Sequence, residues 1–205
     1  ALGCSRTQTI NIAQPNPITL ALNATSINCF NVCNASVSTV VNGGSPSYTY
    51  SWSVGGTASS ISNQCAGAIT ATVTDSQGCR TSASTVITSQ PDLTVSITPT
   101  NPNCNAQCTG IATTSVSGGA PNYTINWNNG SVGNIVNNLC AGIYTATVTD
   151  FFGCIKTQTV AITTPPAITL TATNGTVSCA GSCDGTVSVT PTGGTPGYFY
   201  NWNTT

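Results

Sequence analysis

Cysteine is the residue type in this chain whose spacing indicates chemistry. The 205-residue sequence contains eleven cysteines, and each of them recurs at an interval of 75 residues. The recurring sets are Cys4, Cys79 and Cys154; Cys29, Cys104 and Cys179; Cys33, Cys108 and Cys183; and Cys65 and Cys140. Cysteines at fixed phases of a repeat are typical of a disulfide framework formed in an oxidising compartment. The sequence therefore predicts an extracellular protein whose repeats are closed by disulfides.

Zinc binding is the alternative chemistry for closely spaced cysteines. Three residues separate Cys29 from Cys33, but the sequence has no second pair so closely spaced in each repeat and no histidine. Structural zinc sites use four cysteine or histidine ligands arranged as a tetrahedron. Disulfides are therefore favoured, and we expect neither a metal nor another cofactor.

The pairing of the cysteines must recur with the same interval. Cys33 and Cys65 each precede an expected strand, so the bond Cys33–Cys65, with its equivalent Cys108–Cys140, is expected to tie two sheets together. The remaining cysteines allow two schemes. Bonds within a repeat would close loops of about 50 residues and stabilise the fold by roughly 4 kcal/mol each; these are Cys29–Cys79 and Cys104–Cys154. Bonds between repeats are the alternative, namely Cys79–Cys104, Cys4–Cys29 and Cys154–Cys179.

The elements that position these cysteines are predicted to be short β-strands. In residues 68–74 (AITATVT), Ile69, Ala71 and Val73 alternate with threonines, and residues 143–149 repeat the alternation. Apolar residues with a period of two, rich in β-branched side chains, are typical of a half-buried strand. No stretch shows a helical period. Short strands, Gly/Pro/Asn turns and the repeat length predict an all-β chain of tandem immunoglobulin-like antiparallel β-sandwiches, of about 75 residues each.

Aromatic residues are expected in the core of each sandwich. A Gly-Gly-x-Pro loop leads into an aromatic strand in every copy, as in GGSPSYTYSW at residues 43–52. Tyrosine and tryptophan at alternate positions of such a strand share one face, which suits core packing. The predicted core aromatic residues are Tyr48, Tyr50, Trp52, Tyr123, Trp127, Tyr144, Tyr198 and Trp202. Phe151 and Phe152 are the exception, because they occupy a turn, where exposed apolar rings indicate a contact between repeats or chains.

The turn Val-Thr-Asp-x-x-Gly-Cys follows the alternating strand at residues 73–79 and 148–154. An aspartate side chain in such a turn commonly accepts a hydrogen bond from the backbone N–H two residues later. Calcium binding is the alternative, but one aspartate per repeat supplies few of the oxygen ligands that calcium needs. Asp75 and Asp150 are therefore predicted to form turns, and no metal site is assigned to them.

Charged residues are scarce, and this excludes several classes of function. The chain has three Lys or Arg residues and four Asp, with no Glu and no His. The near-neutral balance argues against binding to nucleic acid or to anionic membrane surfaces. Without His or Glu there is no ordinary general base near neutral pH, and no G-x-S-x-G motif is present. We therefore expect no enzyme, and no apolar run is long enough to insert into a membrane as a helix.

The repeat boundaries do not coincide with the ends of the sequence. Residues 1–17 match the tail of a repeat, residues 18–92 and 93–167 are complete repeats, and residues 168–205 match the first half of a further repeat. A fixed interval without insertions is typical of a tandem array. The sequence is therefore expected to be a piece of a longer chain.

Two motifs of the chain are similar to those of a known family. The first appears as GGSPSYTYSW, GGAPNYTINW and GGTPGYFYNW, and the second as CAGAITATVTDSQGC and CAGIYTATVTDFFGC. Together they resemble, over nearly the whole chain, the SprB-type repeat of Bacteroidota cell-surface adhesins and gliding-motility filament proteins. In the first copy Ala68-Ile69 stands where the family usually has an aromatic residue, as Tyr144 does in the second.

This resemblance implies a secreted protein of the cell surface, exported by the type IX system. Two functions are expected: a structural repeat region that forms the shaft of an extracellular filament or adhesin, with disulfide-stapled units, or tandem carbohydrate- or surface-binding modules that give adhesion by multivalency. The expected partners are neighbouring repeats, identical chains in a filament and surface polysaccharide. Because repeats of this family behave as independent modules, the bonds Cys29–Cys79 and Cys104–Cys154 are preferred.

Overall fold

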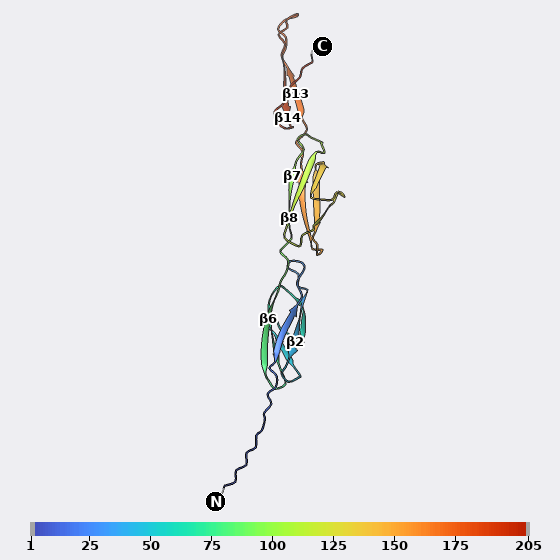
Figure 1. Ribbon diagram of the computed structural model, residues 1–205. Coiled ribbons are helices and arrows are strands. Elements are labelled where there is room, and N and C mark those ends of the chain that lie inside the picture. Colours follow the sequence, from blue (N-terminus) through green and yellow to red (C-terminus); the bar gives the residue numbers. More distant parts are fainter. Residues whose placement is uncertain (1–2, 204–205) are drawn as a thin grey trace. The chain divides into compact units, whose positions relative to one another are not determined.

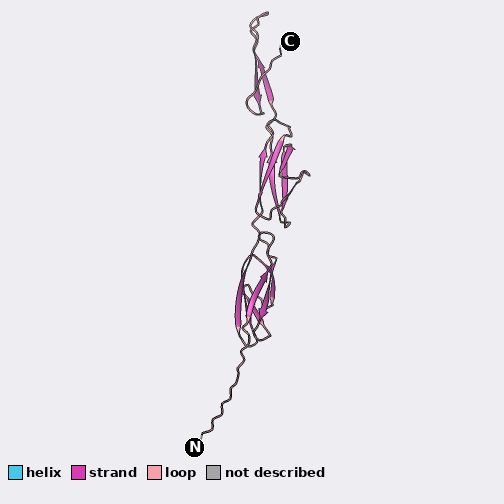
Figure 2. Ribbon diagram, viewed as in Figure 1, coloured by secondary structure: helices cyan, strands magenta, loops and turns pink. Residues whose placement is uncertain are grey.

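The described chain consists of antiparallel β-strands and loops. The computed structural model describes residues 3–203 and divides between Asp92 and Leu93 into two units (Figure 1). Figure 2 shows strands and loops and no helix among the described residues. Residues 3–203 accordingly include no helix that is long and apolar enough to cross a membrane.

The strands recur at the interval of the sequence repeat. The first unit contains β1 (Thr19–Ala24), β2 (Ala35–Asn42), β3 (Thr49–Trp52), β4 (Ser60–Gln64), β5 (Gly67–Thr74) and β6 (Arg80–Ile87). The second unit contains β7 (Thr94–Thr100), β8 (Gly110–Ser117), β9 (Thr124–Trp127), β10 (Ile135–Leu139), β11 (Gly142–Thr149), β12 (Ile155–Ile162), β13 (Thr169–Asn174) and β14 (Val187–Thr192). We call residues 18–92 the first repeat, residues 93–167 the second and the residues from 168 onward the third.

The six strands of each complete repeat form two three-stranded sheets. The strand orders are β1-β2-β4 and β3-β5-β6 in the first repeat, and β7-β8-β10 and β9-β11-β12 in the second. In immunoglobulin sandwiches strands A, B and E belong to one sheet, and strands C, F and G form the other. The same order here, without a strand D, confirms the predicted immunoglobulin-like antiparallel sandwich.

The core of each repeat lies between its two sheets. In β5 the side chains of Ile69, Ala71 and Val73 are 3%, 0% and 0% exposed, which confirms the predicted alternation. Ile27 and Ile87 pack into the same cluster as Ile69. The second repeat has an equivalent cluster, formed by Ala112, Trp127, Val136, Leu139, Ala146 and Ile162. Each complete repeat therefore buries a core of its own.

The strand directions give each repeat two distinct ends. The chain enters at β1, and the loops after β2 and β5 return to that end because paired strands run antiparallel; we call it the proximal end. The loops after β1 and β4 and the linker after β6 lie at the opposite, distal end. A strand of eight residues such as β6 spans about 26 Å. Residues at opposite ends are therefore far beyond bonding distance.

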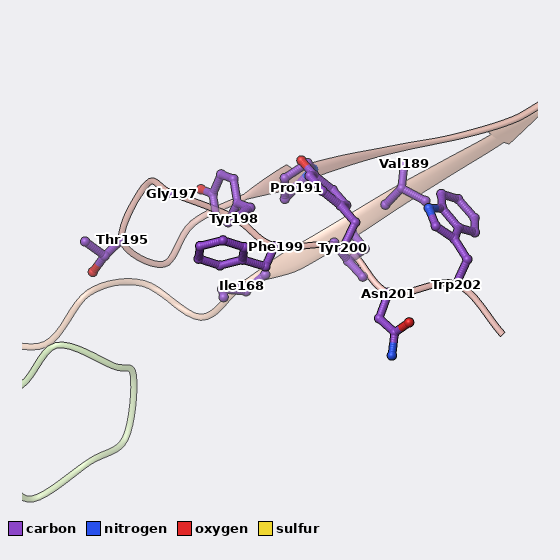
Figure 3. Close-up of a pocket in the computed structure, with 11 residues that line it drawn as sticks. Ile168, Val189, Pro191, Thr195, Gly197, Tyr198, Phe199, Tyr200, Asn201 and Trp202 are labelled. Atoms are coloured by element: carbon purple, nitrogen blue, oxygen red, sulfur yellow. The ribbon is translucent and has the colours of Figure 1, made fainter.

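The third repeat is represented by the hairpin of β13 and β14 and by the aromatic segment that follows it (Figure 3). Tyr198 is half-buried, but Trp202 is 56% exposed. The equivalent Trp52 pairs with Ala71 of β5, and no such strand lies beside Trp202 among the described residues. The prediction of Trp202 as a core residue is therefore wrong for this structure. The hollow lined by Leu170 and the aromatic segment corresponds to the interior of a complete sandwich.

One core hydroxyl yields a prediction for stability. Thr114 in β8 is 5% exposed and its Oγ1 atom has no hydrogen-bond partner. The equivalent Thr39 donates from Oγ1 to the carbonyl oxygen of Ser59 at 3.0 Å. Thr114→Val keeps the shape and removes an unsatisfied buried group, so we expect it to raise the free energy of unfolding by up to about 1 kcal/mol. Thr39→Val, the matched control, should lower it by about 1 kcal/mol.

Urea denaturation of both variants measures these changes. A destabilisation by Thr114→Val as large as that by Thr39→Val would contradict the assignment.

Candidate functional site

The proximal end of each complete repeat is organised around one buried aspartate. Asp75 follows β5 and Asp150 follows β11, and they are 6% and 5% exposed. Oδ1 of Asp75 accepts hydrogen bonds from the backbone N–H groups of Gln77 and Cys79, at 3.0 and 2.8 Å. The second repeat forms the same turn around Asp150. The predicted aspartate turn is thus confirmed in both repeats.

The second carboxylate oxygen reaches a distant loop that the local sequence does not indicate. Oδ2 of Asp75 accepts a hydrogen bond from the N–H of Ser45 at 2.9 Å, and Oδ2 of Asp150 accepts one from Ala120 at 2.9 Å. Both donors lie 30 residues before the aspartate, in the Gly-Gly loop. Each carboxylate therefore joins two loops that are remote in the sequence.

Two glycines let this loop approach both the carboxylate and the incoming linker. Gly43 and Gly44 have φ angles of 72° and 68°, in the left-handed region that favours glycine. A Cβ atom on Gly43 would lie 2.1 Å from the carbonyl oxygen of Pro17, and one on Gly44 would lie 3.0 Å from Oδ2 of Asp75. The N–H of Gly44 donates to the carbonyl oxygen of Asn16 at 2.8 Å. The Gly-Gly pair is the sequence signal for this junction of linker, loop and turn.

The hydrogen bonds keep both carboxylates ionised. The N–H of Ser45 lowers the pKa of Asp75 below its ordinary value of 3.8; burial opposes this effect and the N–H groups of the turn add to it. Burial of Asp150 raises its pKa, but the N–H of Ala120 and those of the turn outweigh burial, so the pKa of Asp150 is lowered as well. Donors aimed at a carboxylate favour its charged form.

A tyrosine hydroxyl closes the Gly-Gly loop in every repeat. The hydroxyl of Tyr48 donates to the carbonyl oxygen of Gly43 at 2.7 Å, and that of Tyr123 donates to Gly118 at 2.7 Å. Tyr198 makes the equivalent bond in the third repeat. The rings of these tyrosines are half-buried. At the edge of the core each tyrosine therefore packs its ring against the repeat and hydrogen-bonds the loop through its hydroxyl.

The other predicted core aromatics contribute to different degrees. Trp52 and Trp127 are 5% and 4% exposed, and each indole N–H donates to a backbone carbonyl six residues later. Tyr50 and Tyr144 are half-buried. Tyr144 packs against the core cluster of the second repeat, and its hydroxyl donates to the carbonyl oxygen of Cys140 at 3.1 Å. The tryptophans are therefore the main aromatic core residues.

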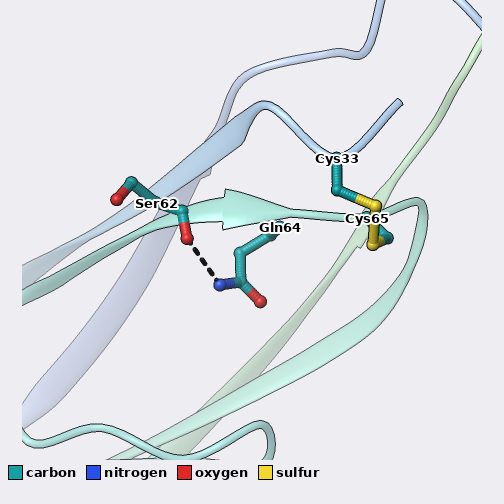
Figure 4. The surroundings of a disulfide bond; sticks show 4 residues. All are labelled: Cys33, Ser62, Gln64 and Cys65. Atoms are coloured by element: carbon teal, nitrogen blue, oxygen red, sulfur yellow. Dashed lines mark hydrogen bonds between the residues drawn. A yellow bond between two sulfur atoms is a disulfide. The ribbon is translucent and has the colours of Figure 1, made fainter.

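A disulfide closes the distal end of each complete repeat. Cys33 is bonded to Cys65 and Cys108 to Cys140, each across 32 residues of sequence, as expected. Cys33 precedes β2 and Cys65 follows β4, which pairs with β2 (Figure 4). The expectation that this bond ties the two sheets is therefore wrong, because it fastens the ends of two strands of one sheet. Closing a loop of this length stabilises a fold by about 4 kcal/mol.

A bulge in β4 sets the position of Cys65. Between Ala35 and Val37 of β2 the register shifts, and β4 contributes one extra residue. Asn63 in β4 has a φ of 57°, and Asn138 in the second repeat has a φ of 58°. Asparagine tolerates this left-handed conformation better than most residues do. An asparagine two residues before the cysteine is the signal that could have indicated the bulge.

The preferred bonds Cys29–Cys79 and Cys104–Cys154 are wrong. The thiols of Cys79 and Cys104 are free and exposed, whereas Cys29 and Cys154 are disulfide-bonded. Within the first repeat Cys29 lies in the distal loop after β1, and Cys79 lies at the proximal end before β6. The length of β6 separates these ends by about 26 Å, whereas a disulfide requires Cα atoms within about 7 Å.

The alternative bonds between repeats are wrong as well. Cys79, Cys104, Cys4 and Cys179 all carry free thiols, which excludes Cys79–Cys104, Cys4–Cys29 and Cys154–Cys179 from this structure. That scheme required a hairpin at the proline boundary between the repeats. Instead β6 pairs with β5, and β7 pairs with β8.

Phe151 and Phe152 stand in the turn of Asp150 at the proximal end of the second repeat. They are 65% and 42% exposed, and their rings meet edge to face with centroids 5.3 Å apart. The first repeat has Ser76 and Gln77 at these positions. The two rings thus form a small apolar patch that the first repeat lacks.

At the two ends of each complete repeat the buried aspartate is engaged by hydrogen bonds, and one pair of cysteines is engaged by the distal disulfide. In residues 3–203 there is no cluster of three or more His, Cys, Asp or Glu side chains that could hold a metal ion. Asp75 and Asp150 each accept three backbone N–H donors. At the proximal end an ionised carboxylate holds two loops together, and at the distal end a disulfide joins the ends of two strands.

Three stretches of the chain match a known family model. The model of the SprB repeat matches residues 21–57, 96–132 and 171–205, which together make up more than half of the chain. Each match begins in the first strand of a repeat and includes the Gly-Gly loop and the aromatic segment. No curated protein matches the chain in sequence.

Several solved structures are similar to the chain at low sequence identity. The chain in "Structural basis for Dscam isoform specificity" is 14% identical with a TM-score of 0.32, and the match covers 74% of this chain and 46% of that one. "Sidekick-1 immunoglobulin domains 1-5" is 10% identical with a TM-score of 0.38, covering 89% and 46%. The amphioxus IgVJ-C2 molecule is 15% identical with a TM-score of 0.30, covering 74% and 98%.

The matched region thus spans less than half the length of the Dscam and Sidekick-1 chains. The immunoglobulin-like assignment rests on the strand order of the two complete repeats.

The buried carboxylates predict how stability depends on pH. The pKa of Asp75 and of Asp150 is lower in the folded chain than the ordinary value of 3.8, so the unfolded chain takes up protons first as the pH falls. Their contribution to stability is therefore complete well above pH 3.8 and is lost as the pH falls through the folded pKa. We expect a flat melting temperature from pH 5 to 8 and a decline below about pH 4.

Asp75→Asn should remove the charge-dependent part of this decline for the first repeat and lower its melting temperature at pH 7. Gln77→Ala is the matched control, because it retains the backbone N–H that Asp75 binds and should leave the profile unchanged. Circular dichroism melts across the pH range measure both. An acid profile of Asp75→Asn identical to that of the unmodified chain would contradict the role of the carboxylate.

Proposed function

The chain belongs to the SprB repeat family, and we propose that it is a structural repeat region of a large secreted surface protein, forming the shaft of an extracellular filament or adhesin. The observation that carries this proposal is the recurrence of one complete module. Every strand, the distal disulfide and the aspartate-locked proximal end of the first repeat recur 75 residues later. A shaft grows in length by adding such modules.

The independence of the modules supports a load-bearing role. Each complete repeat buries its own hydrophobic cluster, and each has a disulfide that holds a strand end. Small domains have little core, and secreted ones commonly compensate with disulfides. A module stabilised in this way withstands an extracellular environment without relying on its neighbours.

The surface composition supports extension and lateral packing. The chain has seven charged side chains in 205 residues, and threonine and serine are common at the exposed strand positions, beside apolar side chains such as Val86 and Ile143. Few charges mean little repulsion between neighbouring chains. Identical chains and neighbouring repeats are therefore the proposed partners.

The scarcity of ionisable groups also supports a function without catalysis. The sequence has no His and no Glu, and two of its four aspartates are engaged by backbone N–H groups at the proximal ends. General acid–base catalysis near neutral pH needs a titratable group poised for proton transfer. We therefore assign this chain a mechanical rather than an enzymatic role.

The disulfides support an extracellular location. Such bonds persist in oxidising compartments and are rare in reducing ones. Export by a type IX system and a part in gliding motility are proposed on the family resemblance.

The second candidate function is binding to carbohydrate or to another surface, and one observation favours it. Phe151 and Phe152 expose a pair of rings in a turn of the second repeat. An exposed apolar patch marks many interaction sites. A weak site of this kind would gain strength through tandem presentation.

Surface labelling tests the proposal. An antibody raised against residues 18–167 should label intact cells that produce the parent protein, on structures that extend from the surface. A matched antibody against a cytoplasmic protein is the control for cell integrity. Labelling that appears only after the cells are permeabilised would overturn the surface assignment.

A glycan array separates the shaft from the binding module. As a shaft, the purified chain should give no signal above a control protein on arrayed polysaccharides. Binding that disappears in the double variant Phe151→Ser and Phe152→Gln, which imports the residues of the first repeat, would favour the adhesive function instead.

A further inference from the structure

We propose that the second repeat binds a free neutral sugar in a cavity between its two sheets. The cavity has a volume of about 400 Å³. It is lined by Thr114, Val116, Tyr123, Ile125, Gly133 and Asn134. All of these residues belong to the second repeat, so the site is complete within one sandwich. A shaft module can carry such a site, and the mechanical role proposed above therefore does not depend on it.

The walls of the cavity come from both sheets. Thr114 and Val116 lie in β8, whereas Ile125 lies in β9 and Tyr123 just before it. β8 belongs to the sheet β7-β8-β10, and β9 belongs to the sheet β9-β11-β12. Val116, Tyr123 and Ile125 are half-buried. The cavity therefore lies between the sheets, beside the hydrophobic core of the repeat.

One side of the cavity is closed by the segment that crosses from one sheet to the other. The N–H of Gly133 donates a hydrogen bond to the carbonyl oxygen of Ile125 in β9, at 3.0 Å. At the next residue the carbonyl oxygen of Asn134 accepts a hydrogen bond from the N–H of Thr114 in β8, at 2.7 Å. Backbone hydrogen bonds to both sheets thus fix this wall before any ligand enters.

A buried hydroxyl without a partner is the first observation that points to a ligand. Thr114 is 5% exposed, and its Oγ1 atom has no hydrogen-bond partner among the described residues. Most buried polar atoms in native proteins have such a partner, because an unpaired one costs free energy. At the equivalent place in the first repeat, Oγ1 of Thr39 donates to the carbonyl oxygen of Ser59 at 3.0 Å. The hydroxyl of Thr114 is therefore left for a group that enters the cavity.

The size of one wall residue is the second observation. The first repeat has Tyr50 where the second has Ile125, so a smaller side chain faces Thr114 across the cavity. The replacement of a phenol ring by isoleucine leaves more room between the sheets. The two repeats thus differ at two positions that line the same cavity, once in hydrogen bonding and once in volume. Local departures from complete hydrogen bonding and close packing are expected where a protein binds a ligand.

The composition of the walls selects the class of ligand. None of the six described residues that line the cavity carries a charge, so a charged ligand would be buried without a partner. A wholly apolar ligand would leave the hydroxyl of Thr114 unpaired. The molecule that remains is neutral and has hydroxyl groups on one side and C–H groups on another. A sugar ring has both, with hydroxyls at its edge and C–H groups on its faces.

The walls can serve both parts of a sugar ring. The hydroxyl of Thr114 and the side-chain amide of Asn134 both donate and accept hydrogen bonds. Val116, Ile125 and the ring of Tyr123 provide apolar surface. The hydroxyl of Tyr123 donates to the carbonyl oxygen of Gly118 at 2.7 Å, which holds the ring in position. A few polar groups within a largely preformed apolar cavity are typical of small-molecule sites.

Nuclear magnetic resonance of the 205-residue chain tests the proposal. D-glucose, D-galactose and D-mannose are each titrated into the ¹⁵N-labelled protein. With at least one of them, we expect saturable shifts of the amide signals that line the cavity, with a dissociation constant of about 1–10 mM, as for a small weakly bound ligand. The equivalent amides 75 residues earlier are an internal control and should not shift. D-glucuronate and benzene, the charged and apolar probes, should shift neither set at the same concentrations.

Two matched variants separate binding from stability. Thr114→Val should weaken sugar binding about tenfold, because it removes one hydrogen bond, although it is expected to stabilise the fold. Thr39→Val should leave binding unchanged although it destabilises the fold. Ile125→Tyr, which introduces the residue of the first repeat, should abolish binding. If Ile125→Tyr does not fold, the comparison of the two threonine variants still decides.

Three results would overturn the proposal. The absence of a saturable shift with all three hexoses would mean that the cavity holds only water. Shifts that are equal in the two repeats and unchanged in Thr114→Val would mean binding to the outer surface. Tighter binding of benzene or D-glucuronate than of any hexose would mean that the class of ligand is wrong. None of these results changes the labelling of cells, which tests the surface-protein proposal separately.

Discussion

A single carboxylate at the proximal end holds together the parts of each repeat that the sequence keeps far apart. Asp75 accepts hydrogen bonds from its own turn and from Ser45, and the Gly-Gly loop that carries Ser45 also binds the linker through Gly44. The chain has only seven charged side chains. Burying one of them costs free energy unless hydrogen bonds compensate for the lost hydration. It is tolerated because three N–H donors solvate it, and those donors would otherwise be unpaired backbone groups in loops.

The distal end of each complete repeat is closed by a covalent bond, the disulfide between the ends of two strands. β4 reaches Cys33 only after a bulge at Asn63, and the disulfide then fixes the strand end. The outgoing linker is held by weaker contacts that differ between repeats. In the first repeat the N–H of Ile27 donates a hydrogen bond to the carbonyl oxygen of Thr88 in the linker. The second repeat has Pro102 in place of Ile27, and a proline has no N–H to donate. There the side-chain oxygen of Asn101 accepts a hydrogen bond from the backbone N–H of Thr163 in the linker. Both repeats therefore hold the linker by a hydrogen bond at this place, although the donor and acceptor groups differ.

The strands and the aspartate turns could be predicted from the sequence, because they depend on patterns within a few neighbouring residues. The alternation of Ile69, Ala71 and Val73 with threonines required a strand with one buried face, and the aspartate turn follows from residues four apart. The contact of Asp75 with Ser45 could not be predicted in the same way, because it depends on how two loops meet after the sheets have formed. Trp202 shows the same dependence, since an aromatic side chain is buried only where a neighbouring strand covers it.

The error in the cysteine pairing has a simple origin in the periodicity itself. Cys79 and Cys154 occupy the same phase of the repeat, as do Cys29 and Cys104. The bonds Cys29–Cys79 and Cys79–Cys104 therefore join the same two phases, and no count of residues separates them. What separates them is strand direction: β6 carries the chain from the end of Cys79 to the end of Cys29 within one repeat. Two cysteines at opposite ends of one repeat cannot bond to each other. The direction of one eight-residue strand therefore excludes a bond that the spacing of the cysteines in the sequence allows.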